Sequence, residues 1–209
     1  MTQTGEANQD QREYWTGEGA EFWHLCGDWW GEMFAPFGQA MFDAADLQPG
    51  ERVLDVGCGF GTTTVEAAER VAPHGAAVGI DVAPQLLETA RKRAAGIGNI
   101  SWLQGDAQVH PFEPASYDVV ISRFAAMLFD DPPTAFANLH RALRPGGRLS
   151  FVCWQDPTKV EWIAVAIAAA VPVVGRPPDL GEPGAPGPFA FGDGERARKL
   201  VSAGGFSDV

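Results

Sequence analysis

Three glycines at alternate positions, close to an acidic residue, form the part of the sequence whose residue types and spacing are best suited to chemistry. Gly57, Gly59 and Gly61 follow a short apolar run that contains Asp55. Because glycine has no Cβ atom, the backbone of such a turn can lie within contact distance of a ligand. A helical pattern begins directly after the turn, and the first N–H groups of a helix are free to bind polar groups. The pattern therefore predicts a nucleotide-binding site.

Two residues near the turn bear on the kind of nucleotide. The fingerprint of dinucleotide-binding folds would have its third glycine where Thr62 stands. Asp55 lies two residues before the first glycine, and a carboxylate there suits a ligand with positive charge, such as an amino-acid ammonium or a sulfonium. The turn thus favours a positively charged ligand over a pyrophosphate.

The elements that must position this turn alternate between strand and helix from residue 51 onward. Apolar runs predict strands at residues 52–56, 76–80, 100–103, 117–121 and 149–154. Helical patterns lie between them, at residues 62–71, at residues 84–95, and around Phe136, Leu139 and Leu143 before Arg-Pro-Gly-Gly. This order predicts an α/β fold, with a doubly wound, mainly parallel Rossmann-like sheet and helices on both faces.

Acidic residues come at the carboxyl ends of the first three predicted strands: Asp55, Asp81 and Asp106. In a doubly wound sheet these ends meet at one crevice, where ligands bind. An acid about 20 residues beyond the glycine turn, as Asp81 is, suits the hydroxyl groups of a ribose. Asp81 alone does not distinguish a dinucleotide-binding fold from a fold that binds a nucleotide with positive charge, because both use such an acid.

The run Asp-x-Gly-x-Gly-x-Gly at residues 55–61 resembles motif I of the class I S-adenosylmethionine (SAM) methyltransferases. Gly-Asp-Ala at 105–107 resembles the element that holds the adenine of SAM in that family, and RALRPGGRL at 141–149 is similarly typical of it. The resemblance covers about residues 50–155 and implies SAM as the cofactor. The cofactor-binding residues that it implies are Asp55, Gly57, Gly59, Gly61, Asp81, Val82, Asp106, Ala107, Arg123 and Trp15.

The N-terminal segment is unusually rich in aromatic residues. Nine of the 22 Phe, Trp and Tyr residues lie between Tyr14 and Phe42. Their helical spacing predicts helices that pack on the sheet. In the family that the sequence resembles, N-terminal helices often form a lid over SAM, so residues 1–48 are expected to be an aromatic-rich helical lid. Packing and lid roles both remain open, and His24 within this segment is the candidate catalytic base.

Two further parts complete the expected organisation: a SAM-binding core at residues 49–155 and a substrate-side part at residues 156–209. The latter holds a predicted helix near 159–170, a Pro/Gly-rich loop and a second helix near 195–203. The family's sheet closes with a sixth and an antiparallel seventh strand, for which the sequence leaves only 206–209. We therefore expect strands six and seven to be truncated, and self-association through the exposed edge of the fifth strand.

Composition narrows the class of partner. The net charge is −12 and the 15 basic residues are scattered, so no basic stripe for a nucleic acid is visible. No apolar run reaches the roughly 18 residues that a membrane span requires. Three widely separated cysteines argue against disulfides and a metal site. The absence of a basic stripe therefore favours a small-molecule acceptor, and a polar N-terminus without a secretory signal predicts a cytoplasmic protein.

These patterns predict SAM-dependent methyl transfer to oxygen or carbon of a small molecule by in-line displacement. The alternatives are a nicotinamide-dependent reductase, disfavoured by Thr62 and by the lack of a Tyr-x-x-x-Lys pair, and a SAM-binding fragment without catalysis. Asp131-Pro132-Pro133-Thr134 is similar to the Asp-Pro-Pro-Tyr motif of amino-methylating DNA enzymes, but its position predicts a helix N-cap.

Overall fold

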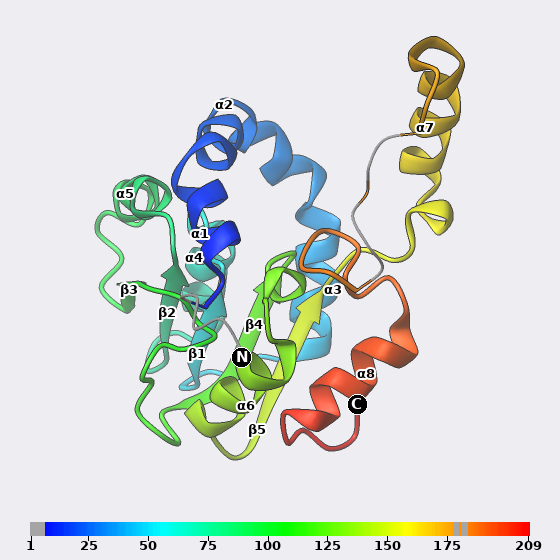
Figure 1. The fold of residues 1–209 in the computed structure, drawn as a ribbon. Coiled ribbons are helices and arrows are strands. Elements are labelled where there is room, and N and C mark those ends of the chain that lie inside the picture. The colour runs from blue at the N-terminus through cyan, green and yellow to red at the C-terminus, as the bar shows by residue number, and fades with distance from the viewer. Residues whose placement is uncertain (1–6, 178–179, 181–183) are drawn as a thin grey trace.

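A five-stranded parallel sheet forms the centre of the computed structural model, which describes residues 7–177, 180 and 184–209 (Figure 1). The strands are β1 (Arg52–Val56), β2 (Ala76–Asp81), β3 (Ile100–Gln104), β4 (Tyr117–Arg123) and β5 (Leu143–Val152). Their order is β3-β2-β1-β4-β5, and every neighbouring pair is parallel. The predicted doubly wound sheet is thus confirmed. From β1 the chain adds β2 and β3 on one side and then β4 and β5 on the other. A ligand crevice is therefore expected between the carboxyl ends of β1 and β4, where the strand order reverses.

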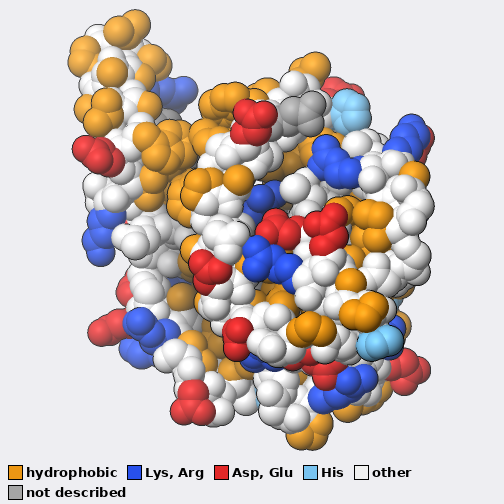
Figure 2. Space-filling model, turned by 180° about the vertical axis from the view of Figure 1, so that it is seen from behind, with side chains coloured by type: hydrophobic (Ala, Val, Ile, Leu, Met, Phe, Trp, Pro, Cys, Tyr) orange, Lys and Arg blue, Asp and Glu red, His pale blue; other side chains and the backbone are white. Residues whose placement is uncertain are grey.

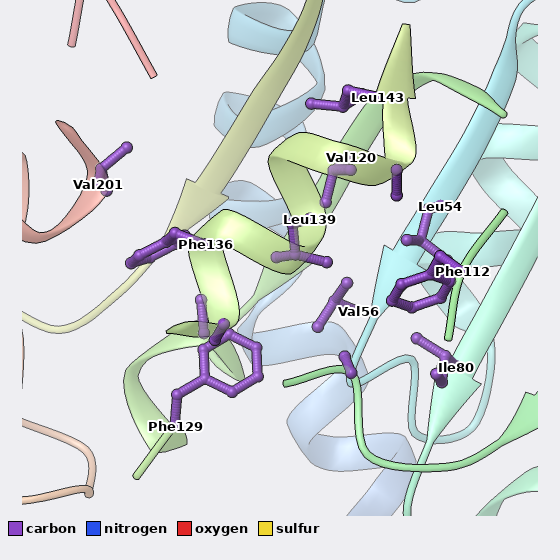
Figure 3. Close-up of a cluster of buried hydrophobic side chains, with 14 of the residues drawn as sticks. Leu54, Val56, Ile80, Phe112, Val120, Phe129, Phe136, Leu139, Leu143 and Val201 are labelled. Atoms are coloured by element: carbon purple, nitrogen blue, oxygen red, sulfur yellow. The ribbon is translucent and has the colours of Figure 1, made fainter. Parts of the chain in front are cut away.

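Helices cover both faces of the sheet. One face carries α3 (Ala35–Ala45) and α4 (Thr62–Arg70), and α5 (Pro84–Arg93) connects β2 to β3. The other face carries α6 (Pro132–Ala142) and α8 (Gly194–Ala203). Each face has its own apolar core: Met41 and Phe42 of α3 pack with β1 and β4 on the first, and Phe136 and Leu139 of α6 pack with Val201 on the second (Figure 3).

The N-terminal helices divide into two groups by where they lie. The side chains of Met41 and Phe42 in α3 are fully buried against the sheet. By contrast, α1 (Gln9–Thr16) and α2 (Glu18–Met33) lie across the carboxyl ends of the strands (Figure 1), and α1 buries none of its residues. Part of the aromatic segment is therefore core, and part of it covers the edge where a ligand is expected.

The boundaries of β5 and α7 differ most from the predicted ones. β5 begins at Leu143, where Arg-Pro-Gly-Gly was expected to be a helix stop, and the register shifts between the Tyr117–Leu143 and Val119–Arg148 pairs because Pro145 cannot donate to the ladder. The helix α7 (Glu161–Val174) continues through Pro172 and ends at Gly175, whose φ is +78°. Asp131 caps α6 by accepting from the N–H of Thr134, which confirms the predicted N-cap.

The C-terminal part leaves two features without a partner among the described residues. Among the described residues, β5 pairs with β4 alone, and no further strand follows it. The helix α7 projects from the rest of the molecule and contains no buried residue, and its surface is largely hydrophobic (Figures 1 and 2). No helix in the described part is both long enough and apolar enough to span a membrane. Truncation of the sheet and self-association stay predictions.

Candidate functional site

A cleft lies over the carboxyl ends of β1, β2 and β4. It encloses about 1150 Å³ of empty space, including its open mouth. The glycine turn and the residues after β2, β3 and β4 form its floor, and side chains of α1, of α2 and of Phe34, which precedes α3, form a wall. The cleft therefore lies at the reversal of strand order, where the topology predicts a ligand.

All three positions of the glycine turn favour glycine by their backbone conformation, and two of them also have a close neighbour. The φ angles of Gly57, Gly59 and Gly61 are +66°, +52° and +75°, a backbone region that favours glycine. A Cβ atom on Gly57 would lie 2.1 Å from the Cβ of Ala125, so the turn packs closely against the segment after β4. Gly57 and Gly59 line the cleft, whereas Gly61 faces Trp102 and forms the N-cap of α4.

Asp55 lies behind the lining of the cleft rather than in it. Its side chain is fully buried, and Oδ2 accepts hydrogen bonds from the hydroxyl groups of Thr63 and Thr64 at 2.7 and 2.6 Å. The other oxygen, Oδ1, has no partner among the described residues. Burial raises the pKa of Asp55, and the two threonines and the charge of Arg123 oppose that rise. Asp55 thus fixes the start of α4 and gives the glycine turn a negative potential.

Arg123 brings a positive charge to the same end of the cleft. The side chain is half-buried at the end of β4 and lines the cleft. Burial lowers the pKa of Arg123, while the nearby carboxylates of Asp55 and Glu66 support its charge. Within the described residues the guanidinium makes no direct hydrogen bond or ion pair. A half-buried guanidinium of this kind is suited to a carboxylate of a ligand.

Asp81 connects the end of β2 to the glycine turn. Its Oδ2 accepts from the backbone N–H of Gly59 at 2.8 Å, and its Oδ1 accepts from the N–H of Ala83 at 2.9 Å. Burial raises the pKa of Asp81. Because each carboxylate oxygen can accept two hydrogen bonds, both oxygens retain a position for the hydroxyl groups of a ribose. Val82, beside it, also lines the cleft.

Asp106 and Ala107 line the cleft after β3, as expected from the Gly-Asp-Ala motif. Both oxygens of Asp106 accept from Nδ2 of Asn8 at 2.9 Å, and Oδ1 also accepts from the N–H of Gln108. Asn8 was not identified from the sequence, because no motif surrounds it. It precedes α1 by one residue and reaches Asp106 across 98 positions of the chain.

Aromatic rings form the wall that α1 and α2 contribute. Trp15 meets Trp23 edge-on with 5.8 Å between ring centroids, and Trp23 stacks on Trp30 at 5.5 Å. Trp30 in turn stacks on Phe34 at 5.0 Å, and all four residues line the cleft. The predicted cofactor residue Trp15 is therefore brought to the site, and it arrives as part of a continuous aromatic surface.

His24, the candidate base, is not brought to the cleft. It borders a second cavity, together with Cys26 and Arg93, between α2 and α5. Its ring lies edge-on to Phe60 with 5.7 Å between centroids. The described residues that line the main cleft include no histidine. Residues that the sequence did not single out for the site, and that the cleft nevertheless contains, include Asn8, Arg12, Phe124, Leu128 and Phe129.

Comparison with known proteins gives the same assignment as the geometry. Residues 53–147 match the family described as methyltransferase domain. The chain is 40% identical over 134 residues to nocamycin O-methyltransferase of Saccharothrix syringae, covering 63% of this chain and 48% of that protein. It is 39% identical over 122 residues to aklanonic acid methyltransferase of Streptomyces sp. (strain C5), covering 57% and 56%. The chain thus spans about half the length of the curated relatives it matches.

Among solved structures, a SAM-dependent methyltransferase from Aquifex aeolicus has the same fold, with a TM-score of 0.61 at 19% identity over 81% of this chain and 79% of that one. The matched segment, residues 53–147, contains the glycine turn and the three acids at the strand ends. Sequence family, fold and site geometry therefore agree: residues 53–147 match the methyltransferase-domain family, and the fold is the one seen in a SAM-dependent methyltransferase.

Proposed function

We propose that the protein transfers the methyl group of SAM to oxygen or carbon of a small-molecule acceptor. The observation that carries this proposal is the convergence of Asp81, Asp106, Arg123 and two glycines on one cleft. The relatives support the acceptor class, because they are a nocamycin O-methyltransferase and an aklanonic acid methyltransferase. The buried carboxyl of Asp55 behind the glycine turn also suits a cofactor that carries an ammonium and a sulfonium, because its negative potential favours positive charge.

Each part of SAM has a chemically matched group in the cleft. Asp81 would accept from the ribose hydroxyls, while Asp106 and the N–H of Ala107 would hold the adenine. Arg123 would pair with the amino-acid carboxylate, and the negative potential of Asp55 behind the glycine turn would favour the positively charged end. When bound, SAM supplies an activated methyl group on a sulfonium, so this chain's residues have only to hold donor and acceptor in line.

The aromatic wall would assist transfer by electrostatics and by exclusion of water. Rings such as Trp23 and Trp30 attract a cation over their faces and keep the site dry. After β4, the apolar side chains of Phe124, Leu128 and Phe129 line the same cleft, and we assign them to the acceptor. Phe124 has a φ of +59°, an uncommon angle for a bulky residue, and such strained residues are concentrated at functional sites.

The cleft favours an acceptor that ionises without a strong enzyme base. No histidine is among the described residues that line it, and His24 faces another cavity. Phenols and enols stabilised by neighbouring carbonyl groups lose a proton to water readily, whereas an alcohol does not. We therefore expect acidic phenols, enols or activated carbon acids to be methylated, and aliphatic alcohols to be inert.

A methyl-transfer assay tests this function. Purified protein is incubated with SAM that carries a trideuterated methyl group and with a panel of phenols and β-dicarbonyl compounds, and both products are followed by mass spectrometry. The proposal predicts S-adenosylhomocysteine (SAH) together with an acceptor that is heavier by the labelled methyl group. SAM binding without SAH formation across the whole panel would favour the alternative, a SAM-binding protein without catalysis.

We also propose that a second copy of the chain pairs with the outer edge of β5. This edge has no strand partner among the described residues, and unpaired edge groups readily pair with another chain. The nearby helix α7 exposes Trp162, Val165 and Val173, which adds apolar surface. Light scattering over a range of protein concentrations should show a dimer or larger species. A monomer at all concentrations would contradict this proposal.

A further inference from the structure

The position of α1 across the cleft depends on polar contacts at its two ends. None of its eight residues is fully buried, and its apolar packing rests mainly on the ring contact of Trp15 with Trp23. At its carboxyl end, the backbone oxygen of Thr16 accepts from the side chain of Gln85 at 3.0 Å. At its amino end, Asn8 is only 6% exposed and makes the contacts with the sheet. Asn8 is thus a buried polar anchor at the amino end of a helix that has no fully buried residue of its own.

The carboxamide of Asn8 joins three segments of the chain. Its Nδ2 donates to both oxygens of Asp106, and its Oδ1 accepts from the backbone N–H of Asp130. These partners lie 98 and 122 positions away, in the turn after β3 and just before α6. Its φ of +51° is one that asparagine tolerates better than most residues. Both polar ends of the side chain are therefore used.

A count of hydrogen bonds shows that Asn8 leaves Asp106 able to bind a ligand. A carboxylate has about four acceptor positions, two on each oxygen. On Oδ1 they are taken by Asn8 and by the N–H of Gln108, whereas Oδ2 accepts from Asn8 alone. One position remains on Oδ2, and Asp106 lines the cleft. That single position suits one N–H of an exocyclic amino group, which is what an adenine presents.

We propose that Asn8 is a positioning residue that couples closure of α1 to recognition of the adenine. It turns the free position of Asp106 toward the amino group, and by the same hydrogen bonds it fastens α1 across the cleft. Tight binding of the adenosyl group and a closed α1 then stabilise each other, because both depend on one orientation of Asp106. This inference rests on the proposed function, since it takes SAM or SAH as the ligand.

The test compares Asn8→Ala with the control Gln9→Ala, whose side chain is exposed and, among the described residues, donates to Glu13 one turn later. Calorimetric titrations use two ligands, SAH and its inosine analogue, in which an oxygen replaces the amino group and cannot donate to Asp106. We expect Asn8→Ala to weaken SAH about tenfold, which corresponds to the loss of one charge-assisted hydrogen bond. The inosine analogue should lose less than about threefold by the same reasoning.

A second readout follows α1 without reference to affinity. Backbone hydrogen exchange of residues 9–16 should be faster in ligand-free Asn8→Ala than in wild type or Gln9→Ala, and SAH should protect these residues in wild type. Equal losses for both ligands would show a merely structural role and overturn the inference, as would unchanged affinity and exchange. Failure of wild type to bind SAH would instead refute the proposed function, and the exchange rates would still decide whether Asn8 fastens α1.

Discussion

Asp81 accepts a hydrogen bond from the backbone N–H of Gly59, with 2.8 Å between Oδ2 and the nitrogen. The acid that ends β2 therefore holds the turn that follows β1 in place. Because both residues also line the cleft, we expect this one carboxylate to serve both the shape of the turn and its affinity for a ligand. The effect of changing Asp81 should accordingly appear in binding and, more weakly, in stability.

Replacement of Asp81 by alanine should weaken SAM and SAH binding. Hydrogen bonds from a ribose to a charged carboxylate contribute about 1.5–3 kcal/mol, or some ten- to a hundredfold in affinity. Isothermal calorimetry measures the loss, and circular dichroism checks that the fold is retained. Glu88→Ala is the matched control, because Glu88 is an exposed acid that pairs with Lys92 on α5. Equal affinities for wild type and Asp81→Ala would remove Asp81 from the site.

Replacement of Arg123 by methionine should weaken the binding of a ligand that carries the amino-acid end of the cofactor more than the binding of a ligand that lacks it. SAH contains the amino-acid carboxylate that we assign to Arg123, whereas 5′-methylthioadenosine lacks it. Loss of a charge-assisted pair should weaken SAH about tenfold or more, with less than about twofold for methylthioadenosine. Competition with a fluorescent adenosyl ligand gives both constants. A similar loss for both ligands would mean that Arg123 does not contact the carboxylate.

Substitution of Gly57 by alanine should destabilise the protein through both the backbone and a clash. The φ of +66° disfavours alanine, and its Cβ would lie 2.1 Å from that of Ala125. We expect a loss of about 2–4 kcal/mol in the free energy of unfolding, the sum of a backbone cost and overpacking. Gly96→Ala is the control, since its φ is +90° with nothing within 4 Å. A loss no greater than that of Gly96→Ala would show that Ala125 moves aside.

The raised pKa of Asp55 makes a prediction about pH and stability. Since burial raises this pKa in the folded protein, the folded state binds the proton more tightly than the unfolded chain does. The carboxyl therefore favours folding most at low pH, and this contribution is lost as the pH rises from the ordinary carboxyl value through the raised one. Asp55→Asn keeps an oxygen for Thr63 and Thr64 but has no charge to bury.

Calorimetric melting of wild type and Asp55→Asn over a pH series checks this sign. The melting temperature of the variant should rise relative to that of wild type between about pH 4, near the ordinary value of a carboxyl, and neutral pH. A difference that does not change with pH, or that changes in the opposite direction, would show that Arg123 or a neighbouring group keeps Asp55 ionised throughout.

Local patterns were sufficient to predict the sheet and much of the site. Strand 52–56, the glycine turn and Asp81 lie within short stretches whose spacing is set by backbone geometry, so their arrangement follows once the strands are parallel. The doubly wound topology then placed the residues after the strands at one cleft. The sequence could not show that Asp55 lies behind the lining, because that depends on the hydroxyls of Thr63 and Thr64 turning toward it.

Features that depend on tertiary contacts were not predicted. The contact of Asn8 with Asp106 joins residues 98 positions apart, and no local pattern contains that information. The orientation of His24 depends on which face of α2 meets the cleft, and both faces are rich in aromatic residues. The continuation of α7 through Pro172 was also missed, because a proline signals a probable end of a helix rather than a certain one.

The central claim is that the cleft over β1, β2 and β4 binds SAM, and parallel calorimetric titrations with SAM and with NADH test it most directly. The account predicts that SAM saturates a single site in wild type, that Asp81→Ala weakens this binding while Glu88→Ala does not, and that NADH gives no heat of binding. Saturable binding of NADH, with no binding of SAM or SAH, would contradict it.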